Sequence, residues 1–277
     1  MARDGGLGIL VALGLGGLGT AAYLLLRPRS ALTASSLPRR DETPRGARKS
    51  FLAVDGERVL IFGDSLSHPG SDAGPTIIDI NGDPGSASSS APGAVLGARL
   101  LAGTDTGGQR AQAVRLNARV GRSARSFLFR EDGASLLARD KAWKPTKVIV
   151  MLGTNDIDRG IGVTALAQTK DALGQIRDMY RGLGAEVVAI GPPAYRNPKY
   201  TKSAPAMLAA IREVFGADRV LDAQPLTSGA ARSKDGVHFT QAGAALAGKQ
   251  LAQALTASAG GSGFGGGWSG GGAGSSW

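Results

Sequence analysis

The sequence contains no cysteine and only two histidines, His68 and His238. The missing cysteine excludes disulfide bonds, thiolate metal ligands and a thiol nucleophile. Two histidines are too few for a zinc site built from several imidazole ligands. The glycines at positions 14, 16 and 19 match the spacing of the dinucleotide fingerprint, but no strand precedes them. We therefore expect neither a metal nor an organic cofactor.

Aromatic residues make up only 5% of the chain, so the core must be built mainly from Val, Ile, Leu and Ala. Basic residues are in excess, with a formal net charge of +10. Residues 1–50 hold eight Arg or Lys and three Asp or Glu, so half of this excess precedes the main domain. The sequence has no basic stripe interleaved with aromatic residues and no helix-turn-helix pattern, so we expect no nucleic-acid partner.

Residues 5–26 form an uncharged stretch whose length suits a membrane-spanning helix, which needs about 20 apolar residues. Small residues recur every fourth position on this stretch and could pack against a second helix, which would allow self-association. They are Gly8, Ala12, Gly16 and Thr20. We predict an N-terminal transmembrane anchor at 1–26. A cleaved signal peptide and a secreted protein are the alternative, and the side of the membrane stays open.

The remaining chain divides into three parts. Residues 27–50 are rich in Arg, Pro and Ser and are predicted to be a basic linker. Residues 51–258 are expected to form the main folded domain. Residues 259–277 form a Gly/Ser-rich tail that cannot bury a core, so we expect it to be disordered.

Within 51–258, strand patterns alternate with helix patterns. Five short, apolar, β-branched segments are predicted as strands, at 58–63, 113–120, 147–152, 186–190 and 219–222. Helical spacing is clearest at 166–183 and 240–255. This alternation predicts a three-layer α/β/α sandwich around a five-stranded parallel sheet, of the flavodoxin-like kind. Ligands in such folds bind at the carboxyl ends of the strands.

Three polar motifs follow predicted strands or precede a helix. Ser65 comes just after the first strand, but a serine needs a base to become a nucleophile. Asn155 follows the third strand and could cap a turn or donate to an oxyanion. Asp235 stands three residues before His238, close enough to fix the tautomer of that imidazole. His68 competes for the role of base, but it has no carboxylate at a fixed offset.

The segments GDSLS (63–67), GTND (153–156) and DGVH (235–238), in this order, resemble the signature segments of the SGNH/GDSL hydrolase superfamily. The similarity covers about residues 59–255. It implies that Ser65 is the nucleophile, that His238 is the general base and then acid, and that Asp235 orients it. It also implies an oxyanion hole made by the backbone N–H groups of Ser65 and Gly121 and the side-chain amide of Asn155.

We therefore expect a serine esterase that removes a small acyl group, such as acetyl, from a small molecule or a cell-envelope glycan. A lipid esterase, lysophospholipase or thioesterase is the alternative enzyme, and a non-catalytic structural or assembly protein is the alternative class. Asp64, Tyr195 and Arg196 are candidates for substrate binding. The long segment 67–92 is either a lid or substrate wall, or a disordered insertion.

Overall fold

The computed structural model describes residues 51–70, 76–80, 89–130 and 133–257. The predicted anchor at 1–26, the linker at 27–50 and the tail at 259–277 lie outside these ranges, so they stay predictions. Of the helices within the described ranges, none combines the length and the apolar character that a membrane span requires.

The described residues form a six-stranded sheet in the order β2-β3-β1-β4-β5-β6. The strands are β1 (Arg58–Gly63), β2 (Thr76–Ile80), β3 (Ala113–Ala118), β4 (Lys147–Met151), β5 (Glu186–Ile190) and β6 (Val220–Leu221). All pairs except that of β2 with β3 are parallel. The five parallel strands are those predicted from the sequence, and β3, β4 and β6 are slightly shorter than predicted.

The strand β2 corrects the prediction of five strands. It pairs with β3 in antiparallel fashion, with Ile78 opposite Leu116. Ile80 is buried against the core, while Asp79 forms an ion pair with Arg115 of β3 at 2.6 Å. Residues 76–80 therefore form an edge strand of the sheet and not a lid. Isoleucine, a β-branched residue, favours such a half-buried strand position.

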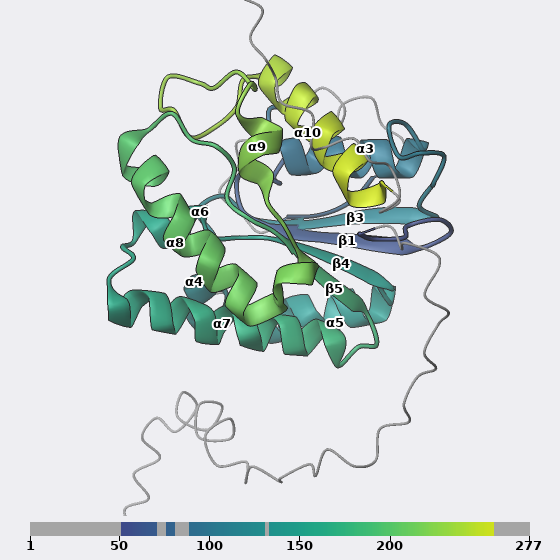
Figure 1. The fold of residues 1–277 in the computed structure, drawn as a ribbon. Helices are drawn as coiled ribbons and strands as arrows, with labels where there is room; N and C mark the ends of the chain where they lie inside the picture. Colours follow the sequence, from purple (N-terminus) through teal and green to yellow (C-terminus); the bar gives the residue numbers. More distant parts are fainter. Residues whose placement is uncertain (1–50, 71–75, 81–88, 131–132, 258–277) are drawn as a thin grey trace, which may run out of the picture. The chain divides into compact units, whose positions relative to one another are not determined.

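Helices cover both faces of the sheet (Figure 1). They are α3 (Pro92–Ala102), α4 (Ala124–Arg130), α5 (Gly133–Trp143), α6 (Thr154–Asp158), α7 (Val163–Arg181), α8 (Pro198–Phe215), α9 (Ala223–Thr227) and α10 (Gln241–Thr256). The helices α3, α9 and α10 lie on one face, and α4, α5, α7 and α8 lie on the other. This arrangement is the predicted α/β/α sandwich.

Alternation along β1 divides the apolar core into two layers. Leu60 and Phe62 belong to the cluster beneath α4, α7 and α8, whereas Val59 and Ile61 belong to the cluster beneath α3 and α10. Successive side chains of a strand point to opposite faces, so a strand covered on both sides must be apolar throughout. The same reasoning explains why the central strands could be recognised in the sequence.

The two helices predicted most clearly are also present. The face expected on α7 is buried at Thr169, Leu173, Ile176 and Tyr180. The helix α10 begins after Thr240, whose hydroxyl accepts a hydrogen bond from the Gly243 N–H at 3.1 Å. Such a side chain satisfies one of the free N–H groups at a helix start.

Two glycines in helices should respond oppositely to alanine. A Cβ at Gly248 of α10 would lie 2.6 Å from Val95 Cγ1 of α3, whereas a Cβ at Gly174 of α7 would meet no atom within 4 Å. Gly248→Ala should lower the free energy of unfolding by about 1–3 kcal/mol through overpacking. Gly174→Ala should raise it by about 0.5–1 kcal/mol through helix propensity. Urea unfolding of both variants checks this, and equal effects would contradict close packing of α3 on α10.

Candidate active site

The polar motifs meet at the carboxyl edge of the sheet. Ser65 lies in the turn after β1, Gly121 follows β3, and Asn155 lies in the first turn of α6, the helix that follows β4. The loop that carries Asp235 and His238 leads into α10. Parallel strands end at one edge, so the turns that follow them come together there.

Ser65, His238 and Asp235 form one chain of hydrogen bonds. Ser65 Oγ lies 3.0 Å from His238 Nε2, and His238 Nδ1 lies 2.6 Å from Asp235 Oδ2. An ionised carboxylate only accepts, so Nδ1 carries the ring hydrogen and Nε2 is left to accept from the Ser65 hydroxyl. The residues predicted as nucleophile, base and orienting carboxylate are therefore adjacent and joined by hydrogen bonds.

The carboxylate of Asp235 is held in its ionised form. Burial alone would raise its pKa, but hydrogen bonds from His238, the Val237 N–H and the Ser233 hydroxyl together hold that pKa well below the usual range. Asp235 Oδ1 accepts from Ser233 Oγ at 2.8 Å and from the N–H groups of Val237 and His238 at 2.8 and 3.0 Å. Ser233 was not identified from the sequence, because nothing in a single serine indicates that it will meet Asp235.

His68, the rival candidate for the base, makes a different contact. Its Nδ1 lies 2.8 Å from the Gly70 carbonyl oxygen, and the side chain is buried. Asp72, four residues after His68, lies outside the described residues. Within the described ranges, no three His, Asp or Glu side chains come close enough together to hold a metal ion.

The turn that carries Ser65 is tightly packed. The Leu66 N–H donates to Asp64 Oδ1 at 2.9 Å, and the Gly93 N–H at the start of α3 donates to the Leu66 carbonyl at 2.9 Å. A Cβ at Gly63 would lie 2.2 Å from Ser67 Oγ, so only glycine fits there. The position of the Ser65 hydroxyl is thus fixed from both sides of its turn.

The expected donors of the oxyanion hole lie on neighbouring turns. Gly121 adopts a φ of 75°, a conformation that favours glycine. One amide hydrogen of Asn155 is taken by the Arg122 carbonyl at 3.0 Å, which leaves the second amide hydrogen available. In the described part of the chain, the backbone N–H groups of Ser65 and Gly121 have no acceptor.

A buried arginine connects the turns after β1 and β3. The Arg122 guanidinium donates to the Gly63 carbonyl at 3.0 Å and to the Asn117 carbonyl at 2.7 Å. The side chain is almost fully buried and lies over the rings of Phe62 and Phe127. Sequence reasoning missed Arg122, because an arginine beside a turn glycine ordinarily indicates an exposed position.

Asp156, the last residue of the GTND segment, was also missed. Its Oδ2 accepts from the Ala124 N–H at the start of α4 at 2.9 Å, and Arg125 lies 3.5 Å from its other oxygen. Asp156 is fully buried and so ties the turn that carries Asn155 to the turn that follows Gly121. An acidic residue directly after Asn155 was the available signal.

The three residues proposed for substrate binding are placed differently from expectation. Asp64 is buried at 1% exposure, and Tyr195 is buried with its hydroxyl 2.8 Å from Thr154 Oγ1. Neither side chain lines the accessible part of the site, which corrects the expectation for both. Polar residues at strand ends can also form hydrogen bonds inside the protein, and Asp64 and Tyr195 do so. Arg196 alone is exposed.

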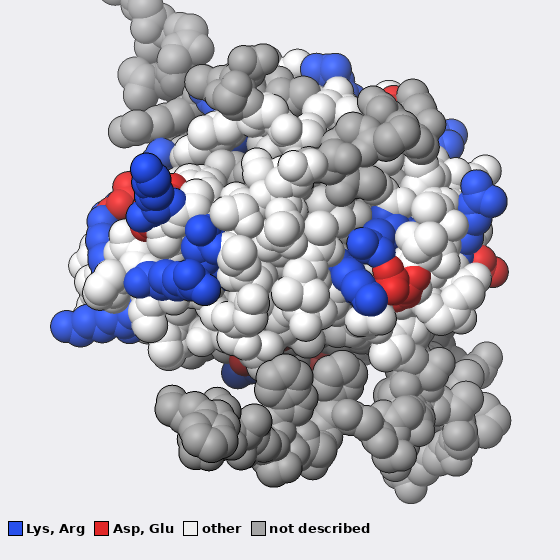
Figure 2. Space-filling view, turned by 90° about the horizontal axis from the view of Figure 1, so that it is seen from above, with Lys and Arg blue, Asp and Glu red and all other residues white. Residues whose placement is uncertain are grey.

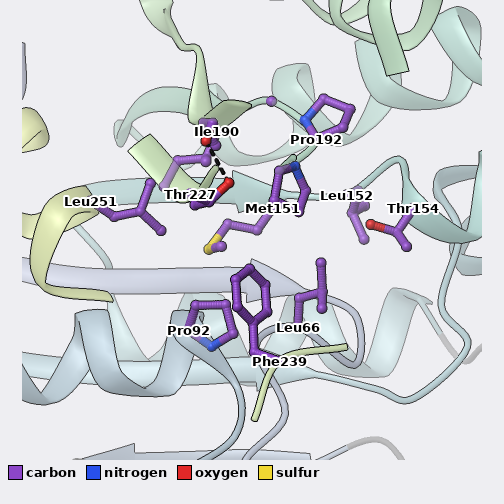
Figure 3. Close-up of a pocket in the computed structure, with 13 residues that line it drawn as sticks. Leu66, Pro92, Met151, Leu152, Thr154, Ile190, Pro192, Thr227, Phe239 and Leu251 are labelled. Carbon is purple, nitrogen blue, oxygen red and sulfur yellow. Dashed lines mark hydrogen bonds between the residues drawn. The ribbon is translucent and has the colours of Figure 1, made fainter. Parts of the chain in front are cut away.

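A small apolar pocket is lined by residues that are neighbours in sequence of Ser65, His238 and Asn155 (Figure 3). Leu66 and Phe239, which follow Ser65 and His238 in sequence, line it together with Thr154, which precedes Asn155. Figure 3 shows Pro192 on the wall opposite Leu66 and Phe239. The cavity measures about 20 Å³, far below the roughly 300–1,000 Å³ of sites for drug-sized ligands. This is about the room that one buried water molecule requires.

Comparison with known proteins gives one family and several similar folds. The model of the GDSL-like Lipase/Acylhydrolase family matches residues 61–246. The solved structure of Axe2, an acetylxylan esterase from Geobacillus stearothermophilus, is similar with a TM-score of 0.53 and 17% identity over 73% of this chain and 95% of Axe2. LAE5, an alpha/beta hydrolase enzyme from the metagenome of Lake Arreo, has a TM-score of 0.49 and 17% identity over 76% of this chain and 100% of LAE5. No curated protein matches the sequence.

Asp64 should make stability depend on pH. Burial raises its pKa from 3.8 to about 7, against the opposing hydrogen bond from the Leu66 N–H. The folded state thus holds a proton that the unfolded chain releases above about pH 4, so this residue lowers the free energy of unfolding as pH rises from about 4 to about 7. The loss is up to about 4 kcal/mol.

Asp64→Asn preserves the shape of the protonated acid but does not titrate. Between pH 5 and pH 7.5, the free energy of unfolding measured with urea should therefore fall less for the variant than for the wild type. Burial also raises the pKa values of Asp140 and Asp156, but both residues are present in the two proteins and cancel in the comparison. Equal declines would show that Asp64 is ionised in the folded protein.

Proposed function

Because this chain belongs to the GDSL-like lipase/acylhydrolase family and is a carboxylic ester hydrolase, we propose that Ser65 is its nucleophile, with His238 as base and Asp235 as the orienting carboxylate. The observation that carries this proposal is the unbroken contact from Ser65 Oγ through the His238 ring to Asp235. A serine activated by an oriented imidazole is a recurring solution to acyl transfer on unrelated folds.

The reaction would proceed in two halves. Ser65 Oγ attacks the ester carbonyl while His238 Nε2 takes the hydroxyl proton, and the imidazolium is stabilised by Asp235. The tetrahedral intermediate collapses, the ester C–O bond breaks, and the leaving alcohol receives that proton. A water molecule then gives a proton to His238 and attacks the acyl group on Ser65. Collapse of the second intermediate releases the carboxylic acid, and the proton returns to Ser65 Oγ.

Negative charge develops twice on the carbonyl oxygen. We assign its stabilisation to the N–H groups of Ser65 and Gly121 and to the amide of Asn155. The absence of intramolecular acceptors for the two N–H groups in the described residues supports this role. The fixed amide of Asn155 supports it as well, because donors that are already aimed cost no reorganisation during the reaction.

The acyl group is proposed to be small, such as acetyl. The apolar cavity lined by Leu66, Phe239 and Pro192 measures only about 20 Å³, which gives no support to a long acyl chain. The uncharged stretch at 5–26 supports a membrane tether, and a tether in turn supports a cell-envelope glycan as the natural substrate. Hydrolysis rates for acetyl, butyryl and octanoyl esters of one phenol test the acyl size, and a preference for octanoyl would contradict it.

Ser65→Ala should abolish ester hydrolysis and covalent labelling. The expected fall in kcat for an aryl acetate is at least about 10³-fold, because the covalent step is lost. A fluorophosphonate probe should modify the wild type at Ser65 and leave the variant unmodified, as mass spectrometry can show. Ser228→Ala removes an exposed serine from the end of α9 and serves as the matched control. Labelling of the Ser65→Ala protein would remove Ser65 as the nucleophile.

Asn155→Ala should lower kcat by about 10²–10³-fold and change KM little, because the lost hydrogen bond acts mainly in the transition state. Steady-state kinetics with an aryl acetate measures both constants. Thermal unfolding must accompany them, since Asn155 also donates to Arg122. A variant that is folded and retains the wild-type kcat would exclude Asn155 from the oxyanion hole.

A further inference from the structure

A second concavity, of about 530 Å³, has Asp235 among its lining residues and so adjoins the hydrogen-bonded chain of Ser65, His238 and Asp235. It is formed by the start of α8 and by the loop before α10, and the side chains that give it its charge are Arg196, Arg232, Lys234 and Asp235. We call it the basic concavity. It is separate from the small apolar pocket and has no residue in common with it.

The single carboxylate of the basic concavity is already occupied. Asp235 Oδ2 contacts His238, and Oδ1 accepts three hydrogen bonds from Ser233, Val237 and His238. Its single negative charge can balance only one of the three positive charges of Arg196, Arg232 and Lys234. The concavity keeps an excess of positive charge directly beside the imidazole.

Two of these cations are exposed and unpaired. The side chains of Arg196 and Lys234 form no ion pair or hydrogen bond with any described residue. Lys199, one turn into α8, behaves differently and is paired with Asp158 at 2.7 Å. Figure 2 shows Lys and Arg side chains at the left and at the right of the face viewed from above, with a largely uncharged centre between them.

The third cation, Arg232, is a buried residue that lines the basic concavity. Arg232 is buried, donates to the Val237 carbonyl at 3.0 Å and to the Ala194 carbonyl, and lies over the Phe239 ring. Burial, together with the nearby positive charge of Arg196, lowers the pKa of Arg232 to about 10. The side chain still carries its charge at neutral pH, so it supplies a fixed positive potential behind the two mobile cations.

We propose that the basic concavity binds an anionic group, a carboxylate or a phosphate, on the alcohol half of the ester substrate. This inference rests on the proposed function. His238 must deliver its proton to the leaving alcohol, so the alcohol lies over the imidazole, which Asp235 holds at the rim of the concavity. The acyl half is directed to the apolar pocket, and the charged half is held by Arg196, Lys234 and Arg232.

Three aryl acetates of similar size test the proposal: neutral 3-acetoxybenzamide, 3-acetoxybenzoate and 3-acetoxyphenyl phosphate. The double variant Arg196→Gln/Lys234→Gln should lower kcat/KM by about 10-fold for the anionic esters at low ionic strength, and by less than about twofold for the amide. Added NaCl should reduce the wild-type advantage over the variant. Lys141→Gln is the matched control. Lys141 is an exposed cation of α5, which leads into the start of β4, whereas the active site lies at the ends of the strands. This variant should leave kcat/KM unchanged for all three esters.

The pattern of losses identifies the anion. A loss confined to the benzoate assigns a carboxylate, a loss confined to the phosphate ester assigns a phosphate, and a loss for both assigns either group. Equal losses for all three esters, or no loss for any, would overturn the proposal. The proposed function fails separately, if Ser65→Ala hydrolyses the neutral amide ester as fast as the wild type does.

Discussion

The active site depends on the parallel pairing of β1 with both of its neighbours. Gly63, the last residue of β1, stands opposite Ala118 of β3 and Met151 of β4. The three strands therefore end at one level, and the turns that carry Ser65, Gly121 and Asn155 leave the sheet side by side. A one-residue slip of either pairing would turn every following side chain to the other face and separate the donors from the nucleophile.

Much of this arrangement could be predicted from the sequence. The strands β1 and β5 have the predicted bounds because they are buried on both faces and read as continuous apolar runs. That Ser65, Asp235 and His238 lie close together could be expected, because their motifs stand at a strand end or before a helix and resemble the signature segments of one family. The edge strand β2 was missed, since a five-residue apolar stretch between Gly-, Ser- and Pro-rich segments has the signature of a loop insertion as well.

The errors have a common physical cause. Asp64 and Tyr195 were expected to face the substrate because polar residues at strand ends usually do, but each is buried with a partner inside the protein. Arg122 and Asp156 were overlooked for the opposite reason. A buried charge is tolerated only where tertiary partners satisfy it, and those partners lie on other strands and helices, where a single sequence cannot reveal them.

Arg122 also has a consequence for the amide of Asn155. An asparagine side chain presents nitrogen on one side and oxygen on the other, and a rotation by half a turn would aim the oxygen at the ester carbonyl and repel the forming charge. The Arg122 carbonyl accepts from the nitrogen and so forbids that rotation. The guanidinium of the same residue anchors that carbonyl to β1. The direction in which the Asn155 amide points is therefore decided when the chain folds, before any ester binds.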